Sequence, residues 1–232
     1  MTNKELTNRL KNNAELAWAA YGYFHLANPN YKPHELDKDG KKLKQFREIE
    51  GYNNPSYSDI LNLNYKSIFK GDFTPTQAKN FFERYDLLEH CPNTDSGFSA
   101  TLFKDLGEFD EKTNTRKADS KDSEYILAIR GTEFKLEQIQ DLLNDYYIGT
   151  NNSDMNRVIE QYFDMLLFYE ETLKPLLQEK GIARINVIGH SLGGYLAQRA
   201  LIYCDSLYKD KLKFSPSEVY TFNAPLESMS VA

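Results

Sequence analysis

Arg184-Ile185-Asn186-Val187-Ile188-Gly189-His190-Ser191-Leu192-Gly193-Gly194 is the stretch that decides the fold. It begins as an apolar run rich in β-branched residues and continues as small residues at helical spacing, so it predicts a strand, a tight turn and a helix. Gly189 and Gly193 flank Ser191 because so steep a turn leaves no room for side chains. The turn predicts that the Ser191 hydroxyl is held open beside the backbone N–H of Leu192, at the positive end of the helix. On its own, the pattern also fits an ordinary turn that happens to contain a serine.

The composition is that of one globular α/β domain. Hydrophobic residues make up 41% of the 232 residues and charged residues 27%, which is enough for a sizeable core. The net charge of −6 argues against nucleic acid as the main partner. Cys91 and Cys204 show no metal-type spacing, so we expect two buried free thiols. The polar start lacks a signal pattern and no run reaches transmembrane length, so we expect a protein that is cytoplasmic or secreted without a cleavable signal peptide.

The first half of the chain is predicted to consist of helices and long loops. Apolar residues at helical spacing predict a helix from Lys4 to Leu26, and we expect its apolar row to pack into the core rather than lie on a membrane. That row is Leu6, Leu10, Ala14, Trp18 and Tyr21. The polar segment that follows predicts loop with one short helix near Lys42 to Ile49. Thr74-Pro75 opens a further predicted helix, which ends near Cys91.

One fragment of the polar segment resembles the start of a calcium-binding loop. It reads Glu35-x-Asp37-x-Asp39-Gly40. Its twelfth position, which needs a bidentate Glu, holds Phe46 instead. We therefore interpret the fragment as a solvated turn and expect no metal site.

The second half alternates strands and helices. Strands are predicted at 97–103, 125–129, 184–190 and 218–222, and helices at 136–147, at 154–180 and directly after Ser191. We expect Pro175 to kink the helix at 154–180. Its buried stripe is predicted to be Val158, Ile159, Tyr162, Phe163, Leu166, Leu167, Leu173, Leu176 and Leu177. This order predicts a mostly parallel sheet with helices on both faces, whose strand ends Gly131-Thr132, His190-Ser191 and Asn223-Ala224 meet in one crevice.

Three landmarks in this order resemble the class 3, fungal-lipase-like branch of the α/β-hydrolases. They are Ile129-Arg130-Gly131-Thr132, Gly189-His190-Ser191-Leu192-Gly193-Gly194 and Thr221-Phe222-Asn223-Ala224-Pro225. The stretch 97–103 and the Arg-Gly-Thr-Glu that begins at Arg130 also resemble bacterial phospholipase A1-like lipases. The resemblance spans about residues 97–226 and implies an α/β-hydrolase-like core at 96–232, with an N-terminal helical and loop region at 1–95 packed on it.

The resemblance also implies roles for individual residues. Ser191 would be the nucleophile, and the N–H groups of Thr132 and Leu192 would form the oxyanion hole. A structural role near the site is implied for Gly131, Gly189, His190, Gly193 and Asn223. Asp141 and Asp145 resemble acidic scaffold positions of the family. No cofactor is implied, and the partner would be a lipid ester, met in solution or at a membrane or micelle surface.

The acid and the base of the family's triad have no counterpart in the sequence after Ser191. The chain's four histidines are His25, His34, His90 and His190, so none follows the nucleophile, where this fold places its base. We expect a C-terminally truncated chain that is weakly active or inactive as an esterase. An alternative is that one of the first three histidines reaches the crevice and acts as the base.

Three functions remain open from the sequence. The first is a serine ester hydrolase of lipase or phospholipase A1 type, the second a non-catalytic binding or structural module with a lipase-like fold, and the third another serine hydrolase, such as a thioesterase or peptidase. Segments 30–73 and 107–123 are candidate mobile covers. An edge strand after Phe222 makes self-association a further expectation.

Overall fold

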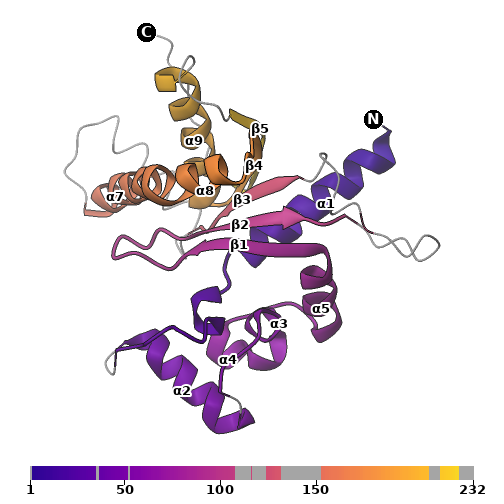
Figure 1. Cartoon of the computed structure of the whole chain (residues 1–232), viewed down its shortest axis with the longest axis vertical. Coiled ribbons are helices and arrows are strands. Elements are labelled where there is room, and N and C mark those ends of the chain that lie inside the picture. Colours follow the sequence, from indigo (N-terminus) through magenta and orange to yellow (C-terminus); the bar gives the residue numbers. More distant parts are fainter. Residues whose placement is uncertain are drawn as a thin grey trace.

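The computed structural model describes residues 2–34, 37–51, 53–107, 116, 124–131, 153–208 and 215–224, with side chains omitted at 153–157, 201–208 and 215–217. In these residues, one sheet lies between helices on either face, and a smaller helical lobe lies below it (Figure 1). The elements are α1 (Asn3–Ala19), η1 (Phe24–Ala27), α2 (Lys38–Glu50), α3 (Tyr57–Leu61), η2 (Leu63–Tyr65), α4 (Lys66–Phe69), α5 (Pro75–Arg84), β1 (Tyr85–Cys91), β2 (Ala100–Asp105), β3 (Tyr125–Ile129), α7 (Ser153–Phe168), η4 (Tyr169–Leu173), α8 (Lys174–Glu179), β4 (Arg184–His190), α9 (Leu192–Tyr208) and β5 (Ser215–Phe222).

The sheet has the order β1-β2-β3-β4-β5 and is mixed. β1 and β2 pair antiparallel, as do β2 and β3, whereas β3, β4 and β5 run parallel to one another. The prediction of an α/β fold with helices on both faces of one sheet is confirmed, and parallel pairing is confined to the three strands whose carboxyl ends border Ser191. β1 and β2 extend this sheet as antiparallel strands because a short connection joins them directly.

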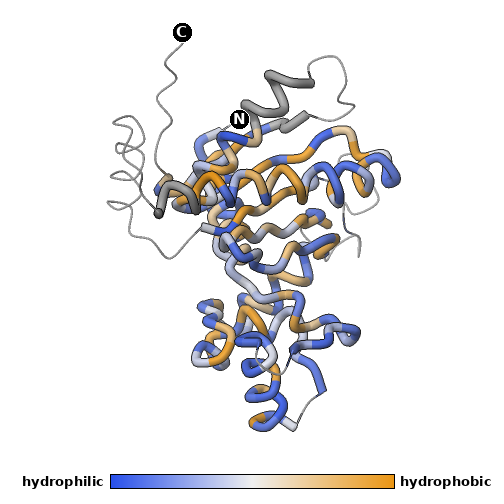
Figure 2. The backbone as a smooth tube through the Cα atoms, turned by 90° about the vertical axis from the view of Figure 1, so that its left-hand side faces the viewer, coloured by the Kyte–Doolittle hydropathy of each residue, from blue (hydrophilic) through white to orange (hydrophobic). Residues whose placement is uncertain are grey.

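Alternate residues of the strands face two separate cores. Phe103, Ile126, Ala128 and Ile188 belong to the core under α1 and the lower lobe. Their sequence neighbours Leu102, Leu127, Ile129 and Val187 belong to the core under α7 and α9. This two-residue alternation is what a sheet covered on both faces requires. Hydrophobic sequence is concentrated on the strands and on the helices packed against them (Figure 2).

The first helix is shorter than predicted, and its predicted apolar row is exposed. α1 ends at Ala19, and a turn at Gly22 separates it from η1. Leu6, Leu10 and Trp18 are 40%, 42% and 56% exposed, which contradicts the predicted packing of this row. The buried side is made by Asn13, Leu16, Ala17 and Ala19 instead. Small alanines let α1 approach the sheet closely, so the larger apolar side chains were not needed for packing.

The fragment that resembles a calcium loop forms the start of α2. Asp37 caps this helix by accepting a hydrogen bond from the N–H of Asp39. Asp39 accepts hydrogen bonds from His25 and Lys42, and Phe46 is fully buried. Among the described residues, no group of three or more His, Cys, Asp or Glu side chains is placed to hold a metal. Glu35 lies outside the described residues.

The helix predicted from Thr74 to Cys91 is two elements. α5 begins with Thr74 as its cap and ends at Arg84, and β1 follows without a loop. The guanidinium of Arg84 donates two hydrogen bonds, of 3.0 and 2.8 Å, to the carboxylate of Asp105 at the end of β2. Pairing of β1 with β2 therefore overrides the helical spacing of Leu87 and Leu88. β1 precedes residue 96, and the division of the chain at 95/96 stays a prediction.

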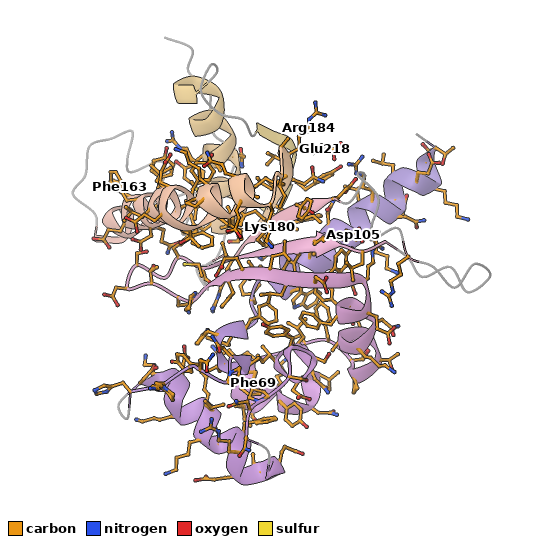
Figure 3. All side chains as sticks on the ribbon, viewed as in Figure 1. Phe69, Asp105, Phe163, Lys180, Arg184 and Glu218 are labelled. Carbon is orange, nitrogen blue, oxygen red and sulfur yellow. The ribbon has the colours of Figure 1, made fainter. Side chains whose placement is uncertain are left out.

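The helix predicted at 154–180 is interrupted rather than simply kinked. α7 passes into a π-helical turn at Tyr169–Leu173, and α8 contains Pro175. Proline has no N–H to donate and its ring crowds the preceding turn, so the ladder widens there. Val158, Leu173 and Leu177 are buried as predicted. Ile159, Phe163 and Leu167 are exposed, and Phe163 points away from the sheet (Figure 3).

Some predictions concern residues that the structure does not describe. These are the helix at 136–147, with Asp141 and Asp145, and nearly all of the segment 107–123. Cys91 is a free, half-buried thiol rather than a fully buried one, and the side chain of Cys204 is outside the described set. None of the described helices combines the length and apolar character needed to cross a bilayer.

Candidate active site

Ser191 occupies a strained turn between β4 and α9. Its φ angle is +56°, a left-handed backbone conformation that residues other than glycine rarely adopt. Its N–H donates to the carbonyl of Phe222 at the end of β5, at 2.9 Å, and its carbonyl accepts from the N–H groups of Gly194 and Tyr195. The parallel neighbour strand and the first turn of α9 thus hold the turn in place, as the sequence predicted.

The two glycines around Ser191 are required by close backbone contacts. A Cβ on Gly189 would lie 2.2 Å from the carbonyl carbon of Gly193. A Cβ on Gly193 would lie 2.3 Å from the carbonyl oxygen of Ile129. Real Cβ atoms do not come so close to backbone atoms, so the strand, the turn and the helix pack together only with glycine at both positions.

The carboxyl ends of β3, β4 and β5 meet at Ser191. A Cβ on Gly131 would lie 3.2 Å from the Cβ of Ser191, and one on Gly194 would lie 2.5 Å from the Cβ of Ala224. Leu192 begins α9, and N–H groups in the first turn of a helix have no acceptor within it. The N–H of Leu192 and the positive end of the helix are therefore available beside Ser191. Thr132, the predicted second donor, lies outside the described residues.

A cavity of about 720 Å³ adjoins Ser191. Its wall on the Ser191 side is formed by Arg130, His190, Phe222 and Asn223, all from the strand ends. The facing wall comes from α1 and from the segment at 60–73, and is mostly apolar. It comprises Ala14, Ala17, Trp18, Tyr21, Gly22, Tyr23, Ile60, Leu61, Phe69, Lys70, Gly71, Asp72 and Phe73. A mostly apolar cavity with a few polar groups in its walls fits a ligand with a long hydrocarbon part and a polar centre.

His190 contacts the end of the first helical region. Its Nδ1 lies 2.9 Å from the hydroxyl of Tyr21, and the two rings meet edge to face. Burial lowers the pKa of His190, so the ring is neutral at neutral pH and Nδ1 can accept the tyrosine proton. The structural role that the resemblance implies for His190 stays a prediction.

Arg130 is held between aromatic rings at the mouth of the cavity. Its guanidinium lies 5.5 Å from the ring centre of Tyr21 and 5.1 Å from that of Tyr23, and it donates to Asn93. The Nζ of Lys42 lies over the ring of Tyr23, 3.4 Å from the ring centre. Burial would raise the pKa of Tyr23, but the positive charges of Arg130 and Lys42 outweigh it and lower that pKa. Tyr23 is thereby fixed as a wall residue.

The remaining histidines are not placed to serve Ser191. His25 pairs with Asp39, and burial lowers the pKa of His90 to about 3, with its Nδ1 2.9 Å from the hydroxyl of Thr101. His34 is exposed in a loop. None of these three is among the cavity's lining residues, which include only His190. The alternative in which one of the first three histidines acts as the base finds no support in this geometry.

Sequence reasoning missed the facing wall of the cavity. The segment 60–73 was treated as part of a polar cover, yet Ile60, Phe69 and Phe73 are buried in it. Their apolar side chains within an otherwise polar segment were the available signal. The helical periodicity of α1 pointed to the right residues, such as Trp18 and Tyr21, but assigned them to a core instead of a cavity.

Comparison with known proteins adds a family to this geometry. The family model Lipase (class 3) matches residues 126–228, which include β3, the turn at Ser191 and β5. That part of the chain is similar to the class 3 lipases. No match to the chain was found among curated protein sequences.

Two solved lipase structures are similar to the whole chain. Lip2 lipase from Yarrowia lipolytica has 19% identity and a TM-score of 0.47, and the match covers 97% of this chain and 61% of that one. The lipase from Rhizopus microsporus var. chinensis has 16% identity and a TM-score of 0.47, with 97% and 59% covered. The chain described here therefore spans less than two thirds of the length of either.

Proposed function

We propose that the protein is a serine ester hydrolase of lipase type that acts on glycerolipids, with a preference of the phospholipase A1 kind. The observation that carries the proposal is Ser191, a serine in a left-handed turn between strand and helix, at the wall of a largely apolar cavity. A turn of this kind presents a hydroxyl to a carbonyl carbon, and the cavity offers room for the attached acyl chain.

The reaction would proceed through an acylated serine. The Oγ of Ser191 attacks the ester carbonyl and loses its proton to a base, and the carbonyl oxygen becomes an oxyanion. The N–H of Leu192 donates to that oxyanion, and Thr132 would supply the second donor. The oxyanion collapses, the protonated alcohol leaves, and water then releases the fatty acid from Ser191. Loss of one oxyanion donor costs about 10²–10³ in rate.

The base is the unassigned part of the mechanism. No histidine follows Ser191 in this sequence, and His190 is bonded to Tyr21. A serine without a base is a poor nucleophile, and an oxyanion hole with substrate binding alone leaves an acceleration of about 10³–10⁴ over water. We therefore expect slow turnover by this chain.

A fluorophosphonate probe with imidazole as an external base tests this proposal. We expect slow phosphonylation confined to Ser191, accelerated by at least about tenfold when imidazole is added, because general-base assistance typically contributes 10²–10⁴. Mass spectrometry of the intact protein and of its peptides measures the adduct. Ser191→Ala should carry none, whereas Ser67→Ala, at an exposed serine on α4, should react like the parent. A parent chain that stays unmodified with imidazole present would refute the nucleophile.

The substrate class needs a separate measurement. Fatty acid released from phosphatidylcholine and from triacylglycerol in mixed micelles, with imidazole present, should depend on Ser191 and be faster for the phospholipid. Faster release from triacylglycerol would contradict the phospholipase A1 preference while keeping the hydrolase.

A non-catalytic lipid-binding module is the second candidate. It is favoured by the lack of a histidine after Ser191 together with the apolar cavity. This module would bind a fatty acid equally well in the parent and in Ser191→Ala, with no adduct from the fluorophosphonate in either.

A further inference from the structure

The exposed face of α1 carries an apolar row that leads into the cavity. Leu6, Leu10, Ala14 and Trp18 follow one another at four-residue spacing, so they lie along one side of the helix. The three large members are between 40% and 56% exposed. Ala14 and Trp18 also line the cavity that adjoins Ser191, and Trp18 meets Phe73 of the facing wall edge to face. The row therefore connects the surface of the molecule with the cavity.

Basic residues accompany this row. Lys4 and Lys11 are exposed, and they are spaced seven residues from each other and from Trp18, so the three share one face of the helix. The two acidic residues of α1 keep their charges and are hydrogen-bonded to neutral groups: Glu5 accepts from the N–H of Thr2, and Glu15 accepts from Gln77. An apolar row flanked by lysines is the pattern of a helix that lies in a lipid–water interface.

A second exposed apolar row lies on α7, where the neighbouring charged residues with described side chains are acidic and Asp164 accepts from Ser96. Ile159, Phe163 and Leu167 are exposed there, next to Glu160 and Asp164. α7 packs on the other face of the sheet from α1, and none of its described side chains lines the cavity. Acidic flanks disfavour an anionic lipid surface, so charge distinguishes the two rows.

We propose that the row Leu6–Leu10–Ala14–Trp18, with Lys4 and Lys11, is the surface by which the protein binds a phospholipid layer that contains anionic headgroups. This inference rests on the proposed function and names the physical source of its substrate. The row places Trp18 at the layer and at the cavity together, so an acyl chain reaches Ser191 along apolar side chains without crossing water.

The chain contains a single tryptophan, so its fluorescence reports on this surface alone. We expect the emission of Trp18 to shift to shorter wavelength with vesicles made of equal amounts of phosphatidylcholine and phosphatidylglycerol, and to be quenched when the lipid tails are brominated. Ser191→Ala should respond as the parent does. Vesicles of phosphatidylcholine alone should bind more weakly.

Paired variants locate the binding surface. Leu6→Ser with Leu10→Ser should weaken binding by at least about tenfold, since two leucines lose their apolar burial. Lys4→Gln with Lys11→Gln should weaken it by about fivefold per lysine and remove most of its salt dependence. Phe163→Ser with Leu167→Ser is the matched control on α7 and should leave binding unchanged. Circular dichroism and thermal unfolding confirm that each variant is folded.

The outcomes separate this surface from the function. If the emission of Trp18 is neither shifted nor quenched while Ser191 still reacts with the fluorophosphonate, the proposed lipid-binding surface is wrong. The proposal of a hydrolase is unaffected by that result. Quenching in a chain whose Ser191 never reacts supports the surface and refutes the nucleophile. Binding that is lost in the α7 control and kept in the α1 variants moves the surface to α7. A dimer that buries α1 and is unaffected by vesicles also overturns the proposal.

Discussion

The two walls of the cavity are built by different means. At Ser191, backbone atoms touch backbone atoms, and the geometry depends on what is missing from Gly189 and Gly193. Across the cavity, bulky side chains such as Phe69 and Phe73 make the wall. Behind it, Lys42 pairs with Asp39 and lies over the ring of the wall residue Tyr23. The comparison teaches that the Ser191 end rests on several backbone contacts within one turn, whereas the facing wall combines apolar bulk with a single contact of this kind, at Gly71, where a Cβ would lie 2.4 Å from the carbonyl carbon of Leu61.

The largest loss of stability is expected at Gly189, where neighbouring backbone atoms leave no room for a side chain. Gly189→Ala places a methyl group 2.2 Å from the backbone of Gly193, so the free energy of unfolding should fall by more than about 4 kcal/mol. Denaturant unfolding measures this. Gly51→Ala is the control, because its φ is +68° but no atom lies within 4 Å, and it should cost only about 1 kcal/mol. Equal losses in the two variants would contradict the contact argument.

A smaller and pH-dependent effect is expected in the support of the facing wall. Burial would raise the pKa of Asp39, but hydrogen bonds from His25 and Lys42 outweigh it and lower that pKa to about 2 from 3.8. Asp39→Asn should therefore lower the free energy of unfolding by about 2 kcal/mol at pH 7.

The pH profile gives the sign of this effect. Because the folded-state pKa is the lower one, the contribution of Asp39 is complete above the unfolded-state pKa and is lost as the pH falls from about 4 to about 2. The parent and Asp39→Asn should converge in stability over that range. Glu48→Gln, at an exposed pair with Lys44, should change stability little at any pH. A difference between the parent and Asp39→Asn that persists undiminished at pH 2 would contradict the ion pair.

The smallest change in stability is expected at Ser191 itself. Its φ of +56° is strained for any residue with a Cβ, so Ser191→Gly should be more stable than Ser191→Ala by about 1 kcal/mol or less. Thermal unfolding of the two variants compares them directly. Lys70→Gly is a matched case, with φ of +58° at the end of α4, and should also gain stability over Lys70→Ala. A less stable Ser191→Gly would mean that the turn is not strained.

The sequence predicted the strand, the turn and the helix around Ser191 because local rules govern them. A strand, two glycines and a helix within 184–194 specify a turn whatever surrounds it, and β3 and β5 were recognised from their apolar runs. The facing wall depends on contacts between distant segments, and helical periodicity cannot tell whether Trp18 meets a core, a cavity or solvent. β1 was missed for a related reason, since its spacing is helical and only its pairing with β2 makes it a strand.

The contact between Tyr21 and His190 joins positions 169 residues apart. During synthesis α1 is completed long before β3, β4 and β5. Leu16 and Ala17 therefore remain unpacked until these strands have been made. The cavity closes only after the ribosome has passed the turn at Ser191, which makes its assembly a late and non-local event in folding. A chaperone that shields the first twenty residues would therefore protect the elements that later close the cavity.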